Sequence, residues 1–554
     1  MGSPLGSTHS GAAVVAAPSP DWVVTAATMQ AIETAMFEAG MPVAALMEKA
    51  AQRLAAWVMA EYPSVAYPRV AVLVGPGHNG GDALVVAREM AHRGYSVQVL
   101  APTDRHKSLT ADHLRYVCAL GVPIAPGLSD DAPSQAVDLW IDGLFGFGLE
   151  RSLEGSLADL VAVVNAHPAP VVSLDLPSGL HTDTGNVLGV AVRATHTLCL
   201  GLWKRAFCQD VALPYLGHRH RIDFDIPPFA LAAGLNNLPP VRHISTSDAL
   251  ARLPLPRAAN CHKYQVSHLL IVAGSRQYAG AALLAGLGAR ASGVGMLTLA
   301  VPESLRWMVV AQLPEALVIG CPETDAGAIA QFPTELALNR YDAITCGPGL
   351  SRQAGAVVDA VCATDRPLLL DADALNHLAE RDPIATLAQR PAPTLITPHL
   401  GEFRRLFPDW SAQPSEQSLD SGQLAQAAAA HSQSIVVLKG ACTAIAHPDG
   451  RLWFNADSTP GLARGGSGDV LTGLMGGLLA QAFAPSSLSQ RQGDPPPPSH
   501  TLDLALDAAL AGVWWHSQTA KDMATRHTEL GVDGPRLAAA LTATLAARSP
   551  TLKL

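Results

Sequence analysis

The chain has 554 residues, a formal net charge of −10 at pH 7, 15% charged residues and 49% hydrophobic residues. This length exceeds what one hydrophobic core supports, so we expect two or more domains. The negative charge argues against nucleic acid as the main partner. The eight cysteines form no CxxC pair and no Cys/His ligand spacing, which favours reduced thiols in a cytoplasmic protein.

Nothing in the sequence indicates a membrane protein. The first basic residue is Lys49, so the N-terminus lacks the charged region of a signal peptide. Residues 470–487 are uncharged and long enough for a membrane span, but their Thr, Gln and Gly residues favour a buried helix. We therefore expect a soluble, cytoplasmic protein with no membrane partner. The sequence leaves the oligomeric state open, and a homo-oligomer is compatible with it.

The first half of the chain alternates helical patterns with short apolar runs. Residues 1–20 are uncharged and rich in Gly, Ala, Ser and Pro, which predicts a disordered tail. Two helical patterns at 25–61 precede the apolar runs RVAVLVG, YSVQVLAP, DLWIDGLFG and VVSLDLPSG. This alternation predicts a parallel, doubly wound sheet in a domain at 21–225. A linker is expected at 226–242, where Pro and Ala are frequent and periodicity is lost.

The second half contains another alternating series, which predicts a second domain at 243–554. Its apolar runs are HLLIVAGS, MLTLAVP, YDAITCGPG, RPLLLDAD, APTLITP and SIVVLKG. Each domain is thus expected to be an α/β fold with a parallel sheet between two layers of helices. The segment at 489–500 contains four consecutive prolines and is expected to be a surface insertion.

Three loops of the first half follow predicted strands and combine glycine with polar side chains. GPGHNGGDALV at 75–85 contains the start of a predicted helix and does not match the GxGxxG pattern. Asp142 is the last residue of the predicted strand DLWID, and Asp175 is the last residue of the predicted strand VVSLD. Because the carboxyl ends of parallel strands meet at one edge, these loops are expected to form one crevice. Asn79, Asp142 and Ser178 offer only oxygen, which favours a hard cation over zinc.

The motifs HNGGD, DGLFGFGLER and DLPSGLHTDTGNVLG, in this order, resemble the NAD(P)H-hydrate epimerase family over residues 27–207, including Lys204. The resemblance implies a Rossmann-like fold, a hydrated NADH or NADPH as ligand, and potassium bound by Asn79, Asp142 and Ser178. Epimerisation at a carbon bearing nitrogen and hydroxyl needs proton transfers, and we expect Asp175 to be the acid/base group. The hydrate contacts implied by the resemblance are His78, Asn79, Gly80, Gly81, Asp82, Gly146, Phe147, Gly148, Leu149, Glu150, Arg151, Ser152 and Asp175.

The chain departs from the epimerase pattern at three positions. His78 stands where the family usually has Asn, Ala83 where it has Gly, and Phe147 where it has Thr. None of these differences removes a carboxylate. We interpret His78 as a position that contacts the hydrate through its backbone. The alternative is that its imidazole changes the binding of the hydrate or the pH dependence of the reaction.

The most informative motif of the second half is GGSGD at 465–469, which precedes the apolar segment VLTGLMGGLLAQAF. Glycines let backbone N–H groups turn inward, and a helix N-terminus favours a phosphate. Asp469 can accept a proton from a hydroxyl that attacks phosphorus. Further polar or glycine-rich strand ends precede it, at GPGLS, DADALN, TPHLGEF and VVLKGACT.

In this order, these motifs resemble the ADP/ATP-dependent NAD(P)H-hydrate dehydratase family, on the ribokinase-like fold, from His243 to the C-terminus. The hydrate contacts that the resemblance implies are Ala281, Gly349, His399 and Asp469. The implied contacts to the adenine nucleotide are Lys439, Gly440, Ala441, Cys442, Thr443 and Gly468. A magnesium ion is expected with the nucleotide, and the resemblance to prokaryotic fused forms of this family implies ADP rather than ATP.

Two departures from the dehydratase pattern affect single positions. Residues 264–267 follow the His-Lys pair where the family usually has glycines, which leaves Lys263 without an assigned role. Ser351 replaces a common Gly after GPGL, and is expected to narrow that loop slightly.

Together the motifs predict a bifunctional repair enzyme. The first domain would interconvert the R and S hydrates. The second would dehydrate the S hydrate and would convert ADP to AMP and phosphate, or ATP to ADP and phosphate. One alternative is a small-molecule kinase of the ribokinase superfamily with an N-terminal nucleotide-binding module. Another is an N-terminal half that binds without turnover. The fused epimerase motifs argue against the first alternative, and the intact Asp142 and Asp175 argue against the second.

Overall fold

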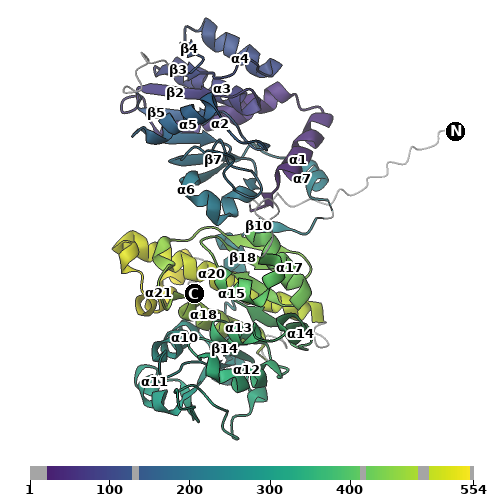
Figure 1. The fold of residues 1–554 in the computed structure, drawn as a ribbon, viewed down its shortest axis with the longest axis vertical. Coiled ribbons are helices and arrows are strands. Elements are labelled where there is room, and N and C mark those ends of the chain that lie inside the picture. Colours follow the sequence, from purple (N-terminus) through teal and green to yellow (C-terminus); the bar gives the residue numbers. More distant parts are fainter. Residues whose placement is uncertain (1–20, 128–136, 237, 412–419, 485–497, 550–554) are drawn as a thin grey trace, which may run out of the picture. The chain divides into compact units, whose positions relative to one another are not determined.

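The computed structural model describes residues 21–127, 137–236, 238–411, 420–484 and 498–549 (Figure 1). The chain divides into two units, of which the first ends at Leu238 and the second begins at Pro239, with Cys208–Asp210 grouped with the second. The predicted tail at 1–20 and most of the predicted insertion at 489–500 lie outside the described residues.

The first unit is built on a seven-stranded sheet in the order β4-β3-β2-β5-β6-β7-β9, and all neighbouring strands are parallel, as predicted. The strands of this sheet are β2 (Arg69–Val74), β3 (Ser96–Leu100), β4 (Ile124–Ala125), β5 (Leu139–Gly143), β6 (Val171–Leu174), β7 (His196–Leu200) and β9 (His218–Ile222). A separate two-stranded pairing joins β1 (Val23–Val24) and β8 (Trp203–Lys204). The helices are α1 (Ala26–Glu38), α2 (Val43–Glu61), α3 (His78–His92), α4 (Ser108–Ala119), α5 (Ser156–Ala166), α6 (Leu213–Leu216) and α7 (Pro228–Leu235).

Helices cover both faces of this sheet. Successive side chains of a strand point to opposite faces, and adjacent residues of β2 accordingly enter different hydrophobic clusters. Val72 packs with residues of α2 and α3, whereas Leu73 packs with residues of α5. Burial on both faces explains why the strands read as continuous apolar runs in the sequence.

The strand order of the first unit reverses between β2 and β5, since β3 lies on the other side of β2. Ligands of open α/β sheets bind outside the carboxyl ends of the strands at such a point. The loops that follow β2 and β5 touch there. A Cβ at Gly75 would lie 1.6 Å from the carbonyl oxygen of Leu144, so only glycine allows the two loops to meet.

The segment at 226–242, predicted as a linker without periodicity, contains helix α7 and the first two residues of strand β10 (Val241–His243). Helix α7 packs so closely on α1 that a Cβ at Gly234 would lie 2.3 Å from Cγ1 of Ile32. With 8 residues, α7 makes little more than two turns. An apolar pattern of that length is too short to recognise, and the prediction missed the helix for this reason.

The second unit has a ten-stranded sheet in the order β10-β19-β18-β17-β16-β15-β14-β11-β12-β13. Besides β10, its strands are β11 (His268–Val272), β12 (Met296–Pro302), β13 (Leu317–Cys321), β14 (Ala343–Cys346), β15 (Leu368–Leu370), β16 (Thr394–Ile396), β17 (Ile435–Leu438), β18 (Thr443–Ala446) and β19 (Leu452–Asn455). The sheet is mostly parallel, as predicted, and the exception lies near one edge, where β18 is antiparallel to both β17 and β19. The loops at 439–442 and 447–451 are too short for a crossover, so these strands form hairpins.

The helices of the second unit lie on both sides of this sheet (Figure 1). They are α8 (Thr246–Ala251), α9 (Lys263–Val266), α10 (Ala279–Ala291), α11 (Arg306–Gln312), α12 (Gly355–Cys362), α13 (Asp373–Leu378), α14 (Pro383–Ala388), α15 (Leu400–Leu406), α16 (Pro408–Ser411), α17 (Ser421–Ser432), α18 (Ser467–Ala482), α20 (Pro498–His527) and α21 (Gly534–Arg548). Helix α18 is buried along most of its length, in agreement with the prediction for 470–487 as far as it is described. Across the described ranges, every helix is too short or too polar to span a bilayer.

Helices α10 and α18 cross in direct contact in the core of the second unit. A Cβ at Gly473 of α18 would lie only 1.8 Å from the carbonyl oxygen of Ala285 in α10. The absence of a side chain therefore lets the two backbones touch. Because Asp469 lies in the first turn of α18, this crossing also sets the position of its carboxylate.

Gly473→Ala is expected to destabilise the protein by roughly 1–3 kcal/mol, because the added methyl group forces the two helices apart. Gly280→Ala is the matched control on α10, since a Cβ there has no other atom within 4 Å. The control variant is expected to leave the stability of the protein unchanged or to raise it slightly, because Ala is a better helix former than Gly. Urea unfolding followed by tryptophan fluorescence would measure both variants, and equal midpoints would contradict the close contact.

Candidate functional sites

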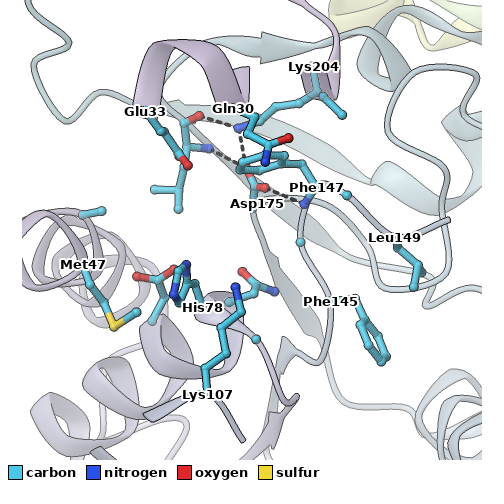
Figure 2. Close-up of a pocket in the computed structure, with 18 of the residues that line it drawn as sticks. Gln30, Glu33, Met47, His78, Lys107, Phe145, Phe147, Leu149, Asp175 and Lys204 are labelled. Atoms are coloured by element: carbon cyan, nitrogen blue, oxygen red, sulfur yellow. Dashed lines mark hydrogen bonds and ion pairs between the residues drawn. The ribbon is translucent and has the colours of Figure 1, made fainter. Parts of the chain in front are cut away.

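The first unit contains a cavity of about 970 Å³ beside the carboxyl ends of β2 and β5 (Figure 2). Its walls come from α1, α2, α3 and the loops that follow β2, β5 and β6. The predicted hydrate contacts that line it are His78, Asn79, Asp82, Gly146, Phe147, Gly148, Leu149, Glu150, Arg151 and Asp175. The three loops that follow these strands therefore do form one crevice.

Three predicted contacts, Gly80, Gly81 and Ser152, are not among the residues that line this cavity. The two glycines instead face neighbouring parts of the protein. A Cβ at Gly80 would lie 2.1 Å from the carbonyl oxygen of Gly75, and one at Gly81 would lie 2.7 Å from the side chain of Met47. In this structure Gly80 allows the start of α3 to pack against the loop that follows β2, and Gly81 allows it to pack against Met47 of α2.

A buried ion pair between Asp175 and Lys204 forms part of the cavity wall (Figure 2). The Lys204 Nζ atom lies 2.5 Å from Asp175 Oδ1, and the two side chains are only 1% and 4% exposed. The backbone N–H groups of Phe147 and Leu200 also donate to this carboxylate, at 3.0 and 3.2 Å. Asp175 is therefore held rigidly at the surface of the cavity.

The backbone at Asp175 adopts a φ of 65°, in the left-handed region that few residues other than glycine occupy. Such strain persists only where the surroundings fix the residue, and it is frequent at functional sites. Lys204 completes those surroundings. Burial opposes the charge of its amine, but the carboxylate of Asp175 raises the pKa of Lys204 overall.

The three predicted potassium ligands lie next to this cavity. Asp142 is fully buried, and its carboxylate accepts hydrogen bonds from the hydroxyls of Ser173 and Ser178, at 2.8 and 2.6 Å. Burial raises the pKa of Asp142, while these donors lower it. Within the described residues, no Lys or Arg pairs with it. The side-chain nitrogen of Asn79 is also buried, and it has no hydrogen-bond partner.

Two charged residues that the sequence reasoning missed, Glu33 and Lys107, line the same cavity. Glu33 belongs to α1, and burial raises its pKa to about 7, although the charge of Lys204 acts in the opposite direction. Lys107 immediately precedes α4. Neither residue belongs to a glycine-rich strand end, so no motif indicated either of them.

In the second unit, the loops after β11 and β14 meet where its strand order reverses. The N–H of Gly274 donates to the carbonyl oxygen of Pro348 at 2.8 Å. Gly349, with a φ of +63°, lies against α10, since a Cβ there would be 2.8 Å from the Cβ of Ala281. The predicted hydrate contacts Ala281 and Gly349 are therefore neighbours.

A second ion pair lies beside the GGSGD loop. The Lys439 Nζ atom is 2.7 Å from Asp371 Oδ1, and the Thr472 hydroxyl donates to Asp371 Oδ2 at 2.6 Å. A Cβ at Gly468 would lie 3.9 Å from Lys439 Nζ, so this ammonium group adjoins the loop. Burial opposes its charge, but Asp371, Glu402 and Asp469 raise the pKa of Lys439 overall.

Asp469 occupies the first turn of α18, which follows Gly466 with a φ of 92°. Burial raises the pKa of Asp469 to about 6; the charge of Asp371 raises it further, and that of Lys439 lowers it. A carboxylate with this pKa is ionised at neutral pH and can still accept a proton, as a general base must. The loop is supported from behind by His516 of α20, whose ring nitrogen lies 2.9 Å from the carbonyl oxygen of Ser467.

His399, a predicted hydrate contact, caps the N-terminus of α15. Its Nδ1 accepts hydrogen bonds from the N–H groups of Gly401 and Glu402, at 3.0 and 3.3 Å. The carboxylate of Glu402 accepts the N–H of His399 in return, which completes a capping box. His399 also forms a β-bridge with Lys439, so a predicted hydrate contact adjoins a predicted nucleotide contact.

Of the other predicted nucleotide contacts, Gly440, Ala441 and Cys442 lie in the turn between β17 and β18, and Thr443 is the first residue of β18. Gly440 and Ala441 are exposed, whereas Cys442 and Thr443 are buried. The Thr443 hydroxyl donates to the carbonyl oxygen of Gly440 at 3.2 Å, which tightens the turn.

Known proteins match both units. The family model described as NAD(P)H-hydrate dehydratase covers residues 269–543, and the one described as YjeF-related protein N-terminus covers 43–206. The bifunctional NAD(P)H-hydrate repair enzyme Nnr of Thermosynechococcus vestitus is 50% identical over 525 residues, or 94% of this chain and 97% of that protein. This chain belongs to the family of bifunctional NAD(P)H-hydrate repair enzymes.

Another relative and one solved structure are also similar to this chain. The enzyme of the same name from Synechocystis sp. is 50% identical over 519 residues, or 93% of each chain. A solved structure of the ADP/ATP-dependent NAD(P)H-hydrate dehydratase from Bacillus subtilis, co-crystallised with ATP and Mg²⁺, is 32% identical. It covers 56% of this chain and 99% of its own, with a TM-score of 0.45. Membership in the family confirms the predicted Rossmann-like and ribokinase-like fold classes.

Proposed function

We propose that this chain repairs hydrated NADH and NADPH with two activities. The first unit interconverts the R and S hydrates, and the second dehydrates the S hydrate at the expense of ADP or ATP. The observation that carries this proposal is that each unit has a carboxylate–lysine ion pair at its predicted site, in a chain whose relatives are named bifunctional repair enzymes. Those relatives match nearly the whole chain, which favours repair over a small-molecule kinase.

The first unit supplies a fixed carboxylate for epimerisation. The reaction inverts a carbon that carries the ring nitrogen and a hydroxyl group, and it requires proton transfers at that hydroxyl. Asp175 is the acid/base group of this proposal, because its side chain reaches the cavity and is held by Lys204 and two backbone N–H groups. A fixed position matters, since proton transfer requires the donor and acceptor within hydrogen-bond distance.

Potassium fits the residues next to this cavity. The carboxylate of Asp142 is buried with only neutral hydrogen-bond donors around it, so a cation would offset the cost of burying its charge. A half-turn of the Asn79 amide would place its oxygen where an unpartnered nitrogen now lies. Asn79, Asp142 and Ser178 would then hold the ion, and its charge would order the loops around Asp175.

The second unit would activate the hydrate for loss of its hydroxyl group. Hydroxide is a poor leaving group, whereas phosphate leaves readily after the hydroxyl has been phosphorylated. Asp469 would take the hydroxyl proton, while the N–H groups of the GGSGD loop and the ammonium group of Lys439 stabilise the transferred phosphoryl group. Elimination of phosphate then regenerates NADH or NADPH.

The nucleotide of this step is expected to be ADP, with ATP as the alternative, and it would bind the turn from Lys439 to Thr443 and Gly468. Among the described residues, no group of three His, Cys, Asp or Glu side chains converges to hold a metal. Magnesium would therefore be held chiefly by the nucleotide phosphates and by water.

The eight cysteines are free thiols, and we expect the enzyme to act in the cytoplasm.

The dehydration rate is expected to fall as the pH decreases through about 6, the pKa of Asp469. Asp469 must be deprotonated to accept the hydroxyl proton, so its active form predominates above this pH and is lost below it. Initial rates of NADPH recovery from the S hydrate at saturating nucleotide, measured from pH 5 to 8, would check this. A rate that stays constant down to pH 5 would argue against Asp469 as the base.

Asp175→Asn is expected to separate the two activities. Asn tolerates the left-handed backbone of Asp175 but cannot accept the proton. With a mixture of both hydrates, the variant is expected to recover the S fraction at the normal rate and then to stall. Near-normal consumption of the R hydrate by this variant would refute the role of Asp175. The initial rate with pure S hydrate serves as the control for the second unit.

A further inference from the structure

Helix α1 turns one face toward the cavity of the first unit. The residues of α1 that line the cavity and follow a helical spacing are Gln30, Glu33, Thr34 and Phe37. Figure 2 shows Glu33 and Gln30 projecting from this helix beside Asp175 and Lys204. On the opposite side, Ile32 and Met36 are buried in the hydrophobic core, which prevents the helix from rotating. The carboxyl group of Glu33 is thereby held at the cavity wall.

Glu33 and Asp175 differ in their partners. Asp175 has an ion pair and two backbone donors, whereas no hydrogen bond or ion pair to Glu33 is formed within the described residues. The charged groups that face Glu33 come from several elements: Lys204 on β8, Asp175 after β6, Asp82 on α3 and Lys107 before α4. Glu33 is thus an unengaged carboxyl group in a cavity that also contains a fixed carboxylate.

Inversion at a carbon through loss and return of water needs two proton transfers, one at the departing oxygen and one at the incoming oxygen. We propose that Glu33 is the second proton-transfer group of the epimerase site and acts together with Asp175. This inference rests on the proposed epimerase function of the first unit. It identifies a residue that the strand-end motifs did not indicate, because Glu33 lies inside a helix rather than in a glycine-rich loop.

The two carboxyl groups account for every proton of the reaction. Glu33 gives its proton to the hydroxyl group of the hydrate, and the carbon–oxygen bond breaks as water leaves with the bonding electron pair. The lone pair of the ring nitrogen forms a carbon–nitrogen double bond. Water then adds to the other face of that carbon, the double-bond electrons return to nitrogen, and Asp175 takes the proton that the water loses. Proton exchange with solvent restores both groups, and no redox partner is required.

The environment of each carboxyl group matches its role. Enzymes separate acid from base by giving two carboxyl groups different surroundings. The pKa of Glu33, raised to about 7 by burial, leaves a large protonated fraction at neutral pH. Asp82 is the competing candidate in the same cavity. Its nearly complete burial raises its pKa well above the usual range, so it would retain its proton rather than exchange it.

The test compares Glu33→Gln, Glu33→Asp and Asp82→Asn with the wild-type full-length protein. Pure R hydrate is supplied without adenine nucleotide, and chromatographic separation of the epimers gives the R-to-S rate between pH 5.5 and 9. Glu38→Gln is the matched control, since Glu38 is exposed at the end of the same helix and does not line the cavity. Thermal unfolding of each variant verifies that it is folded.

We expect Glu33→Gln to lower kcat by about 10²–10⁴-fold with little change in KM, as for loss of a positioned acid. The wild-type rate should fall as the pH rises through about 7, because Glu33 must be protonated to donate. This fall should be absent in Glu33→Gln and retained in Glu33→Asp, which should recover part of the rate. The assignment would be overturned if the Glu33→Gln variant were fully active. It would also be overturned if Asp82→Asn alone removed the fall of the rate as the pH rises. A wild-type protein that does not epimerise would instead refute the proposed function, and the assignment with it.

Discussion

Replacing Asp469 by Asn is expected to lower the rate of NADPH recovery from the S hydrate by about 10²–10⁴-fold. Asn has nearly the same size as Asp and keeps the start of α18 intact, but it cannot accept the proton of the hydroxyl that attacks phosphorus. The pKa of about 6 and the adjacent ammonium group of Lys439 give Asp469 properties that no other residue of the GGSGD loop has.

The measurement for Asp469→Asn is the initial rate of absorbance recovery with S hydrate, ADP and magnesium. The epimerase activity of the same preparation provides an internal control, and it should remain at the wild-type level. Nucleotide binding, measured by calorimetry, should also persist, because the turn that follows β17 is unchanged. If Asp469→Asn retained full dehydration activity, another group would have to be the base.

Lys204→Met is expected to destabilise the first unit by about 3–5 kcal/mol, the usual cost of leaving one partner of a buried ion pair without the other. Both side chains of the Asp175–Lys204 pair are almost fully buried, so water cannot take the place of the ammonium group. The variant should also lose epimerase activity, because Lys204 holds the carboxylate of Asp175 in place. Chemical denaturation of the full chain would show the first unit unfolding at lower denaturant concentration than in the wild type.

The destabilisation of Lys204→Met should depend on pH. Without the cation of Lys204, the carboxylate of Asp175 would be buried unpaired, and the cost of this burial falls on its charged form. The loss of stability should therefore be smallest at low pH and grow as the pH rises. The double variant Asp175→Asn/Lys204→Met carries no buried charge at this position, and should recover much of the stability without recovering activity. A double variant as unstable as Lys204→Met would contradict the ion-pair explanation.

The positions of the acids at the strand ends could be predicted from the sequence. Alternating apolar runs and helical patterns indicate parallel sheets, and residues that follow buried strands must lie at the same edge of a sheet. This reasoning placed Asp175 and Asn79 together, and the structure has both at one cavity. It depends only on the backbone, whose course follows from secondary structure.

The partners of these acids could not be predicted in this way. Lys204 is 29 positions from Asp175, and Lys439 is 68 positions from Asp371, and each pair joins different elements. Which lysine reaches which carboxylate depends on strand register and side-chain direction, and a local pattern does not contain this information. Glu33 was missed for a related reason, because a single acid in an amphipathic helix has the same appearance whether it faces solvent or a cavity.

The most direct test of the central claim follows the wild-type protein with a mixture of R and S hydrates of NADPH, in the presence of ADP, magnesium and potassium. The two proposed activities predict complete recovery of the reduced-nicotinamide absorbance, with one phosphate released per NADPH formed. Recovery that stops when the S fraction is consumed would contradict the epimerase activity of the first unit. No recovery with either ADP or ATP would contradict the dehydratase activity of the second.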